Sequence, residues 1–303
     1  MARGLSRHLH SLPRIIAELG RKNIQAELVA TTGPGSAGPQ ARMQIEAGCD
    51  LILTAGGDGT INETAAGMLG TGVPLGILPG GTANVLAREM HLPGNMEKVA
   101  AQLTAFQPRS IAVGAITIDR SEPRPFICMT GAGLDAEIVS KVNLDLKAAA
   151  GKLAYYVGGF SQVLRSLPDF EVVADGTAHR ASFALISRVR NYGGDLEIAR
   201  RASLLRNDFE VVLFRGTLAM GYLPYLVGVA LKRVHRMNGC TVLHARNVRC
   251  HRPSGEPVYV QVDGELAGKV PMDAEIVPDA LTLLVPEGYP RQEQKYTAVS
   301  VCA

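Results

Sequence analysis

The chain has 303 residues, of which 47% are hydrophobic and 19% charged, and its formal net charge is only +3. This composition is typical of a globular protein long enough for two domains, and the small charge excludes a nucleic-acid-binding protein from our expectations. The five cysteines form no CxxC pair, and no apolar run is long enough to cross a membrane. We therefore expect a cytoplasmic protein without a disulfide framework.

The first third of the chain alternates between helical and strand-like spacing of apolar residues. Helices are predicted at 12–19, 39–47, 62–69 and 82–90, and strands at 25–31, 50–55 and 73–79. The strand at 50–55 is apolar on both faces, as in a parallel strand that is covered on each side. This alternation predicts a doubly wound α/β sheet.

After about residue 110 the pattern changes to short alternating runs that are separated by turns. Such runs are typical of antiparallel β-structure. Two helices are predicted within this region, at 144–167 and at 222–236. The sequence therefore predicts an α/β domain followed by a mostly β domain, with the boundary near residue 112.

Two glycine-rich turns in the first domain each join a predicted strand to a predicted helix. They are "GGDGT" (Gly56–Thr60) and "PGGTAN" (Pro79–Asn84). Loops at the carboxyl ends of parallel strands are where open α/β sheets bind ligands, and free backbone N–H groups at helix N-termini suit phosphate. Either loop alone is explained equally well as a tight turn capped by threonine. Two such loops, one βα unit apart, favour a phosphate site.

Two acidic positions add chemistry to these loops. Asp58 would repel phosphate unless it binds a cation or accepts a proton, and phosphoryl transfer uses both services. The alternative is that Asp58 only caps the turn. "DGE" at 263–265 lies between alternating runs, and on its own an Asp-Gly pair there predicts a hairpin turn.

In order along the chain, "GGDGTINETAAGML", "PLGILPGGTANVLAREM", "FICMTGAGLDAEIV" and "VQVDGE" resemble the diacylglycerol-kinase-type lipid kinases. This family includes bacterial lipid kinases and the sphingosine and ceramide kinases. The resemblance extends from about Leu12 to Val285. NAD kinases and phosphofructokinases share the first motif. The second motif, from Pro79 to Arg88, points to the lipid-kinase branch.

The resemblance implies an ATP- and Mg²⁺-dependent transfer of the γ-phosphate to a lipid hydroxyl. It also implies an ATP-binding domain at 1–112, a β-sandwich-like domain at 113–286 that completes the active site, and a segment at 287–303 that returns to the first domain. The implied nucleotide contacts are Thr31, Gly56, Gly57, Asp58, Gly59, Thr60, Ile61, Asn62, Gly81, Thr82 and Asn84.

The same resemblance implies roles for three carboxylates. Glu265 matches the family's proton acceptor, Asp263 would hold magnesium or share the proton, and in the sphingosine-kinase branch the base is the equivalent of Asp58. We expect the three to converge, and the sequence does not decide which takes the proton. Asp135 and Glu137 fall in a stretch linked to acceptor binding. The alternative, surface carboxylates after a glycine turn, has equal weight.

Three features depart from the family pattern. Family members open with a strand that ends in Asn-Pro-x-x-Gly, whereas this sequence begins with the helix that would follow, so we expect that strand to be missing. Arg206 aligns with an aspartate of the family's structural magnesium turn, and this site would need Asp208 in its place. Arg200 stands where a proline is usual.

Two other functions remain open at this stage, an NAD kinase and a truncated nucleotide-binding protein without transfer activity. For the lipid kinase we expect a lipid substrate and transient, peripheral contact with a membrane surface. The helix predicted at 222–236 is apolar and then basic, so it would suit a bilayer surface or a buried helix with a solvated tip. The class of lipid and the oligomeric state are not specified by the sequence.

Overall fold

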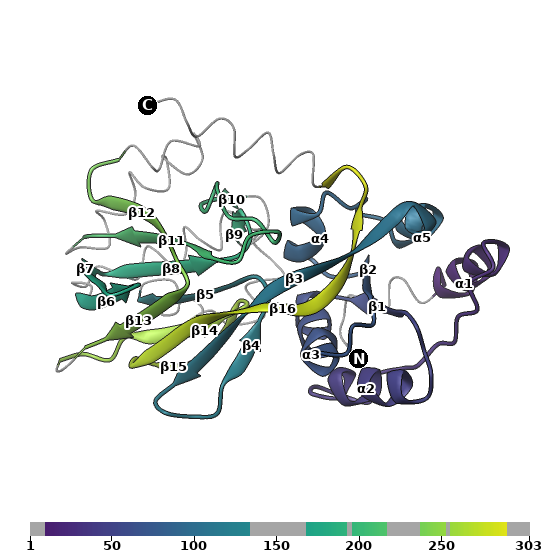
Figure 1. The fold of residues 1–303 in the computed structure, drawn as a ribbon, viewed down its shortest axis with the longest axis horizontal. Coiled ribbons are helices and arrows are strands. Elements are labelled where there is room, and N and C mark those ends of the chain that lie inside the picture. Colours follow the sequence, from purple (N-terminus) through teal and green to yellow (C-terminus); the bar gives the residue numbers. More distant parts are fainter. Residues whose placement is uncertain (1–9, 134–167, 193–195, 217–236, 253–254, 290–303) are drawn as a thin grey trace. The chain divides into compact units, whose positions relative to one another are not determined.

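The computed structural model describes residues 10–133, 168–192, 196–216, 237–252 and 255–289. The chain divides into two compact units (Figure 1). The first comprises Met1–Val113, Ser203–Asn207 and Val277–Ala303, and the second comprises Gly114–Ala202 and Asp208–Ile276. Two long strands, β3 (Phe106–Ile118) and β16 (Met272–Pro286), pass from one unit to the other.

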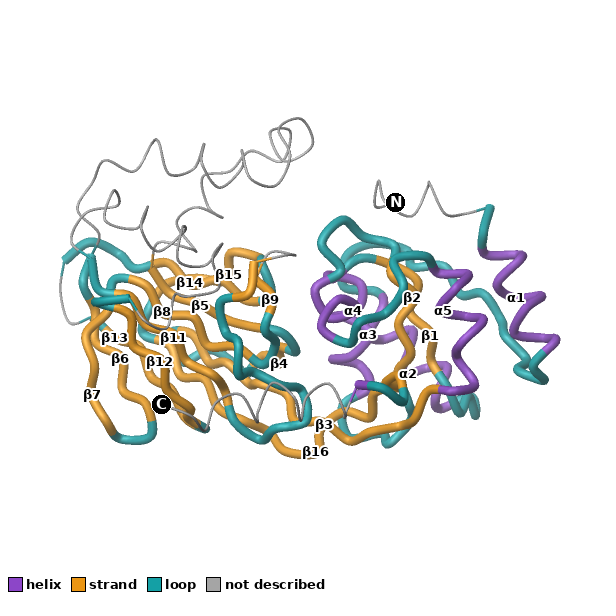
Figure 2. The backbone as a smooth tube through the Cα atoms, turned by 90° about the horizontal axis from the view of Figure 1, so that it is seen from above, coloured by secondary structure: helices purple, strands orange, loops and turns teal. Residues whose placement is uncertain are grey.

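The first unit is the predicted α/β fold. Its remaining elements are α1 (Leu12–Arg21), α2 (Ala37–Glu46), β1 (Ile52–Gly56), α3 (Asp58–Met68), β2 (Leu75–Pro79), α4 (Val85–Glu89), α5 (Met96–Gln102) and a 3₁₀ turn (Leu103–Ala105). β1 and β2 pair in parallel and lie side by side (Figure 2), and β16 pairs in parallel with the other edge of β2. The four predicted helices are present, although α3 begins earlier than expected, inside the first glycine motif.

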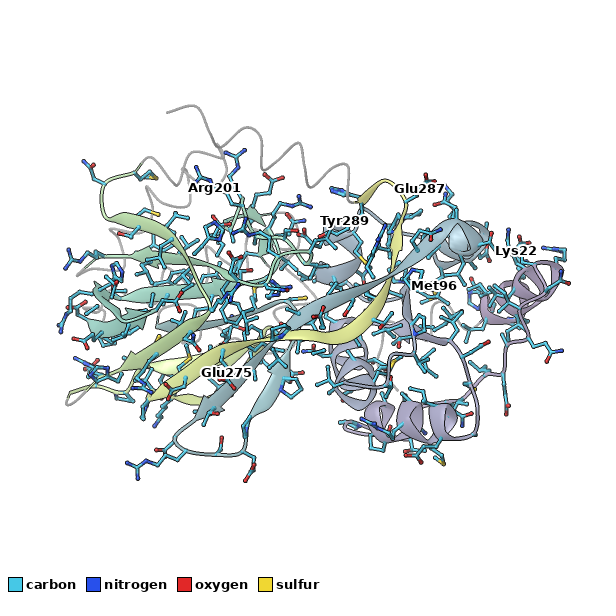
Figure 3. All side chains as sticks on the ribbon, in the orientation of Figure 1. Lys22, Met96, Arg201, Glu275, Glu287 and Tyr289 are labelled. Atoms are coloured by element: carbon cyan, nitrogen blue, oxygen red, sulfur yellow. The ribbon has the colours of Figure 1, made fainter. Side chains whose placement is uncertain are left out.

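Local sequence explains these helices. In α1, Leu12, Ile15 and Leu19 recur at helical spacing and are buried in the core of the unit. The helix α5 was not predicted. The residue that could have indicated the start of this helix is Asn95, whose side chain accepts hydrogen bonds from the backbone N–H groups of the first turn. Met96, labelled in Figure 3, begins this helix and is buried in the same core.

The strand predicted at 25–31 is wrong. These residues form no strand and have no strand partner within the described part of the chain. Ile24 and Ala26 pack on the core, whereas Leu28 is 57% and Val29 41% exposed. Apolar alternation predicts which side chains face a core, but a strand also needs a neighbouring backbone. That neighbour is absent beside this segment among the described residues.

The second unit is built of two large sheets and the short antiparallel pair β9–β10. The six-stranded antiparallel sheet has the order β12–β11–β8–β5–β14–β15, and the other contains β16–β13–β6–β7 and the β3–β4 pair. The strands are β4 (Arg124–Phe126), β5 (Met129–Gly133), β6 (Phe170–Ala174), β7 (Thr177–Ala181), β8 (Phe183–Ser187), β9 (Asn191–Tyr192), β10 (Leu196–Glu197), β11 (Phe209–Phe214), β12 (Cys240–Ala245), β13 (Asn247–His251), β14 (Tyr259–Val262) and β15 (Glu265–Lys269). The predicted antiparallel β-domain is therefore confirmed. The helices predicted at 144–167 and 222–236 lie outside the described residues.

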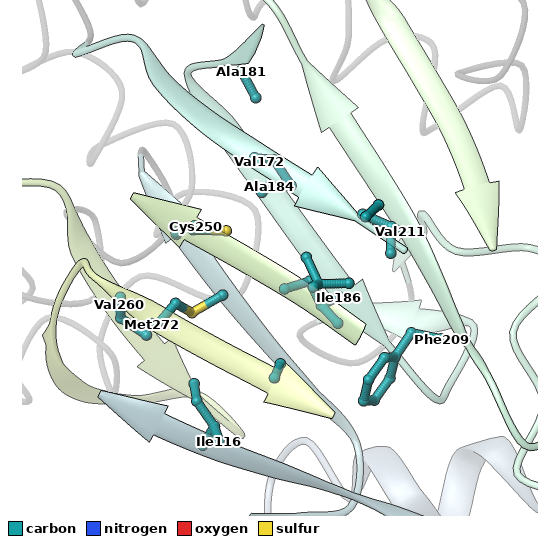
Figure 4. Packing of buried hydrophobic residues seen from close by; sticks show 14 of the residues in the cluster. Ile116, Val172, Ala181, Ala184, Ile186, Phe209, Val211, Cys250, Val260 and Met272 are labelled. Atoms are coloured by element: carbon teal, nitrogen blue, oxygen red, sulfur yellow. The ribbon is translucent and has the colours of Figure 1, made fainter. Parts of the chain in front are cut away.

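The core of the second unit contains inward-facing side chains from both sheets (Figure 4). Phe126 and Phe209 stack in it with their ring centroids 5.6 Å apart. On β14, Val260 and Val262 belong to this core, so the alternation along the strand directs Gln261 to the opposite face of its sheet.

Candidate functional site

The two predicted glycine loops pack directly against each other in the first unit. The backbone N–H of Gly80 donates to the carbonyl of Gly56 at 2.8 Å. A Cβ atom on Gly81 would lie 2.7 Å from the Cα atom of Gly57, which no side chain tolerates. The glycine at 81 is therefore required by this close approach of two backbones as well as by any ligand.

The helix α3 begins inside the first loop. Its first backbone hydrogen bond within the helix runs from Ile61 N–H to Gly57 C=O. The N–H groups before Ile61 precede this ladder and have no partner within the helix, which is the arrangement that binds phosphate at helix N-termini. Starting the helix at Asp58 rather than at residue 62 thus places these donors in the predicted nucleotide loop.

Asp58 links the first loop to the second. Its Oδ2 accepts from the N–H of Asn84 at 2.9 Å and its Oδ1 from the N–H of Val85 at 2.6 Å. Val85 is the first residue of α4, so the carboxylate caps the start of that helix and adds favourable charge there. The sequence left a capping role open as the alternative, and the structure shows a cap on the other loop's helix.

Asn84 holds the second loop closed. It adopts a left-handed conformation with φ of 48°, which asparagine tolerates better than most residues. Its Oδ1 accepts from the Gly81 N–H at 2.8 Å, and its Nδ2 donates to the Gly81 carbonyl at 3.0 Å. Arg88 Nε donates to the Ala83 carbonyl at 2.7 Å. The loop is therefore fixed by its own side chains.

A buried hydrogen-bonded pair that the sequence analysis missed, Tyr289 and Glu89, holds the end of α4. Tyr289, labelled in Figure 3, donates from Oη to Glu89 Oε1 at 3.3 Å, and both residues are buried, although they are 200 residues apart. Met96 packs under the same loop, where a Cβ atom on Gly80 would clash with its terminal methyl group. No local pattern in the sequence could have indicated these contacts.

The other predicted nucleotide contacts differ in accessibility. Gly59 and Thr82 are exposed, Gly57, Thr60, Asn62 and Gly81 are half-buried, and Gly56 is buried. Ile61 is buried in the core, so only its backbone faces the loop. Thr31 is exposed at the end of the unpaired segment. Asp135 and Glu137 lie outside the described residues, so their predicted role stays a prediction.

In the second unit, Asp263 occupies a two-residue turn between β14 and β15, where both Asp263 and Gly264 have positive φ. Its Oδ2 accepts from the Ile127 N–H at 3.1 Å, and its Oδ1 accepts from the Cys128 and Met129 N–H groups at 3.0 and 2.8 Å. The carboxylate thus ties this turn to the connection between β4 and β5.

Glu265 differs from both aspartates. Its side chain is 70% exposed, and among the described residues it has no hydrogen-bond donor. The guanidinium of Arg124 lies 3.9 Å from its carboxylate. Of the three predicted carboxylates, Glu265 is exposed, whereas Asp58 and Asp263 are half-buried and accept from backbone N–H groups.

Asp263 and Asp208, the residues predicted to hold magnesium, have protein partners in the structure. The described residues contain no group of three or more histidine, cysteine or acidic side chains that could hold a metal. The oxygens of Asp263 already accept three N–H groups, and the Asp208 carboxylate lies 3.6 Å from His244 Nδ1. The carbonyl of Asp208 accepts from the buried Arg188. Arg200, which stands where the family usually has a proline, forms an ion pair with Glu197 at 3.9 Å in the second unit.

Two glycine loops at the ends of neighbouring parallel strands, with an antiparallel sandwich in the second unit, make up a fold of the NAD-kinase type. The family model "Diacylglycerol kinase catalytic domain" matches residues 3–116, and the model "YegS C-terminal NAD kinase beta sandwich-like domain" matches residues 128–285. The chain belongs to the diacylglycerol kinase catalytic domain family, which is a family of kinases.

Individual relatives agree with this assignment. The chain is 28% identical to a diacylglycerol kinase of Mycobacterium tuberculosis, over 80% of this chain and 79% of that protein. It is 27% identical to a diacylglycerol kinase of Bacillus subtilis, over 86% of each chain. A crystal structure of a diacylglycerol kinase from Bacillus anthracis superposes with a TM-score of 0.73 at 21% identity, covering 92% of this chain and 93% of that one. An NAD kinase from Archaeoglobus fulgidus in complex with ATP superposes with a TM-score of 0.50 at 12% identity, covering 95% and 94%. The two structures confirm the predicted fold.

Proposed function

We propose that the protein is an ATP-dependent lipid kinase that transfers the γ-phosphate of ATP to a hydroxyl of a diacylglycerol-like lipid. The observation that carries the proposal is the pair of adjoining glycine loops, in which Gly81 packs on Gly57 and the N–H groups of α3 without a partner in the helix lie in the first loop. Membership of a kinase family and the names of the relatives support the choice of lipid.

In the proposed reaction, the first unit binds the nucleotide, and the second supplies the proton acceptor. Backbone N–H groups at the start of α3, in the first glycine loop, hold the phosphates. The lipid hydroxyl oxygen attacks the γ-phosphorus, its proton passes to Glu265, and the bond from the γ-phosphorus to the bridging β–γ oxygen breaks to release ADP. Asp58 and Asp263 position backbone, since their carboxylates are held by N–H donors. ATP would enter as its magnesium complex.

We also propose transient contact with a membrane surface, because a lipid with two long chains stays in the bilayer. None of the described helices is long and apolar enough to span a membrane. Sedimentation with lipid vesicles measures this contact. Protein that stays in the supernatant at every vesicle composition, while active on micellar lipid, would contradict it.

The test of the function is transfer of label from γ-labelled ATP, with magnesium, to lipids in mixed micelles and to NAD. The lipids are a diacylglycerol, a monoacylglycerol, a phosphatidylglycerol and a sphingoid base. We expect label in one lipid class and a loss of about a hundredfold or more in Glu265→Gln, the range for removal of a general base. Glu256→Gln, an exposed glutamate in the same unit, is the matched control. Label in NAD alone, or full activity of Glu265→Gln, would refute the proposal.

A further inference from the structure

Gln261 is a buried polar residue beside the turn that presents Glu265. It lies within β14 and is 1% exposed. Its Oε1 accepts from the N–H of Gly264 at 2.8 Å, inside the Asp263–Gly264 turn. The amide therefore runs along the strand towards the residue that we propose as the proton acceptor.

This hydrogen bond fixes which way the amide points. A backbone N–H needs an oxygen acceptor, so the NH₂ group of Gln261 must be on the other side. Its Nε2 is buried and has no acceptor among the described residues. A buried donor without an acceptor destabilises a fold, and such groups in native proteins call for an explanation such as a ligand.

An apolar side chain lies on the same face of the sheet. Leu266 stands opposite Gln261 in the register of β14 and β15, next to a register shift between Val260 and Gln261, and directly opposite residues point to the same side. Leu266 is 47% exposed and lies on β15, the edge strand of its sheet, where the preceding Glu265 pairs with Val262 at the end of the hairpin. This face thus combines a donor without an acceptor and an exposed hydrocarbon surface, which suits a ligand with an oxygen at the start of an alkyl chain.

We propose that Nε2 of Gln261 donates a hydrogen bond to an acyl ester carbonyl of the acceptor lipid, and that Leu266 contacts the adjoining acyl chain. The proposal rests on the proposed function. The hydroxyl proton of the lipid passes to Glu265 and its oxygen attacks phosphorus, so the ester carbonyls are the strong acceptors that remain. Gln261 and Leu266 then determine specificity for lipids whose chains are attached through esters.

The test compares kcat/KM for a diacylglycerol and for a dialkylglycerol of equal chain length, which lacks the carbonyl oxygens. For the wild type we expect a preference for the diester of about three- to tenfold, which corresponds to one neutral hydrogen bond. In Gln261→Met this ratio should fall to about one, with the KM for ATP unchanged. Gln44→Met, on a half-buried glutamine in α2, should keep the wild-type ratio.

A second variant keeps the test independent of folding at Gln261. In Leu266→Ala, kcat/KM should rise less steeply with acyl chain length than in the wild type. Leu205→Ala, at another exposed leucine, should not change this slope. An unchanged ester-to-ether ratio in folded Gln261→Met, or an unchanged slope in Leu266→Ala, would overturn the inference and leave the kinase activity standing. A wild type that phosphorylates no lipid would refute the proposed function instead.

Discussion

Replacing Asp58 with asparagine tests whether this residue holds backbone or handles the proton. The native carboxylate accepts from the N–H groups of Asn84 and Val85 at 2.9 and 2.6 Å. Asparagine keeps one oxygen, and its NH₂ group then faces the other N–H. Loss of a hydrogen bond to a charged acceptor costs about 1.5–3 kcal/mol, and loss of the charge at the start of α4 adds about 0.3–1 kcal/mol. We expect the free energy of unfolding to fall by about 2–4 kcal/mol.

The assay combines urea unfolding with steady-state kinetics as a function of ATP. If Asp58 holds the second loop in place, the KM for ATP rises in Asp58→Asn, and the pH dependence of kcat keeps its shape. Asp50→Asn, at an exposed aspartate just before β1, is the control for an unspecific loss of charge. An Asp58→Asn protein with unchanged unfolding free energy and ATP KM, but a kcat more than about a hundredfold lower, would refute the argument and make Asp58 the general base.

Two further predictions concern buried groups. In Tyr289→Phe the buried Glu89 loses a hydrogen-bond donor, which should lower the free energy of unfolding by about 1–3 kcal/mol and raise the KM for ATP because α4 is held less firmly. Tyr259→Phe is the control. Equal unfolding curves for the two variants would contradict a stabilising role of the Tyr289–Glu89 hydrogen bond. Burial raises the pKa of the Cys240 thiol to about 11, so at pH 8 iodoacetamide should label it more than about a hundredfold more slowly than the exposed Cys49. Equal labelling by mass spectrometry would show that Cys240 is accessible and ionised.

The parts of the fold that local sequence specifies were predictable. The period of Leu12, Ile15 and Leu19 predicts α1, because three buried side chains on one stripe are enough to orient a helix. The segment at 25–31 shows the limit of such patterns. Its alternation is compatible with a strand, but pairing depends on a backbone elsewhere in the chain, which periodicity does not contain.

The candidate site, like the fold, has features that the local sequence predicts and features that depend on distant parts of the chain. Glycines at positions 57 and 81 predicted two loops that permit close approach, and the loops are there. The partners of the acidic side chains were not predictable, because they depend on long-range geometry. Asp58 reaches donors 26 and 27 residues away, and Asp263 reaches donors more than 130 residues away. Residue type indicates that a carboxylate can bind a metal or a proton, but its surroundings decide whether it does.

Asp58 and Asp263 therefore have the same role, that of holding backbone in place, although they belong to different motifs. Each lies at a turn, and each accepts hydrogen bonds from backbone N–H groups of a different loop. The oxygens of a carboxylate held in this way serve as acceptors that position backbone. A proton acceptor has to gain and lose a proton in each cycle without disturbing the fold. Glu265, exposed and without such donors in the described structure, meets that requirement.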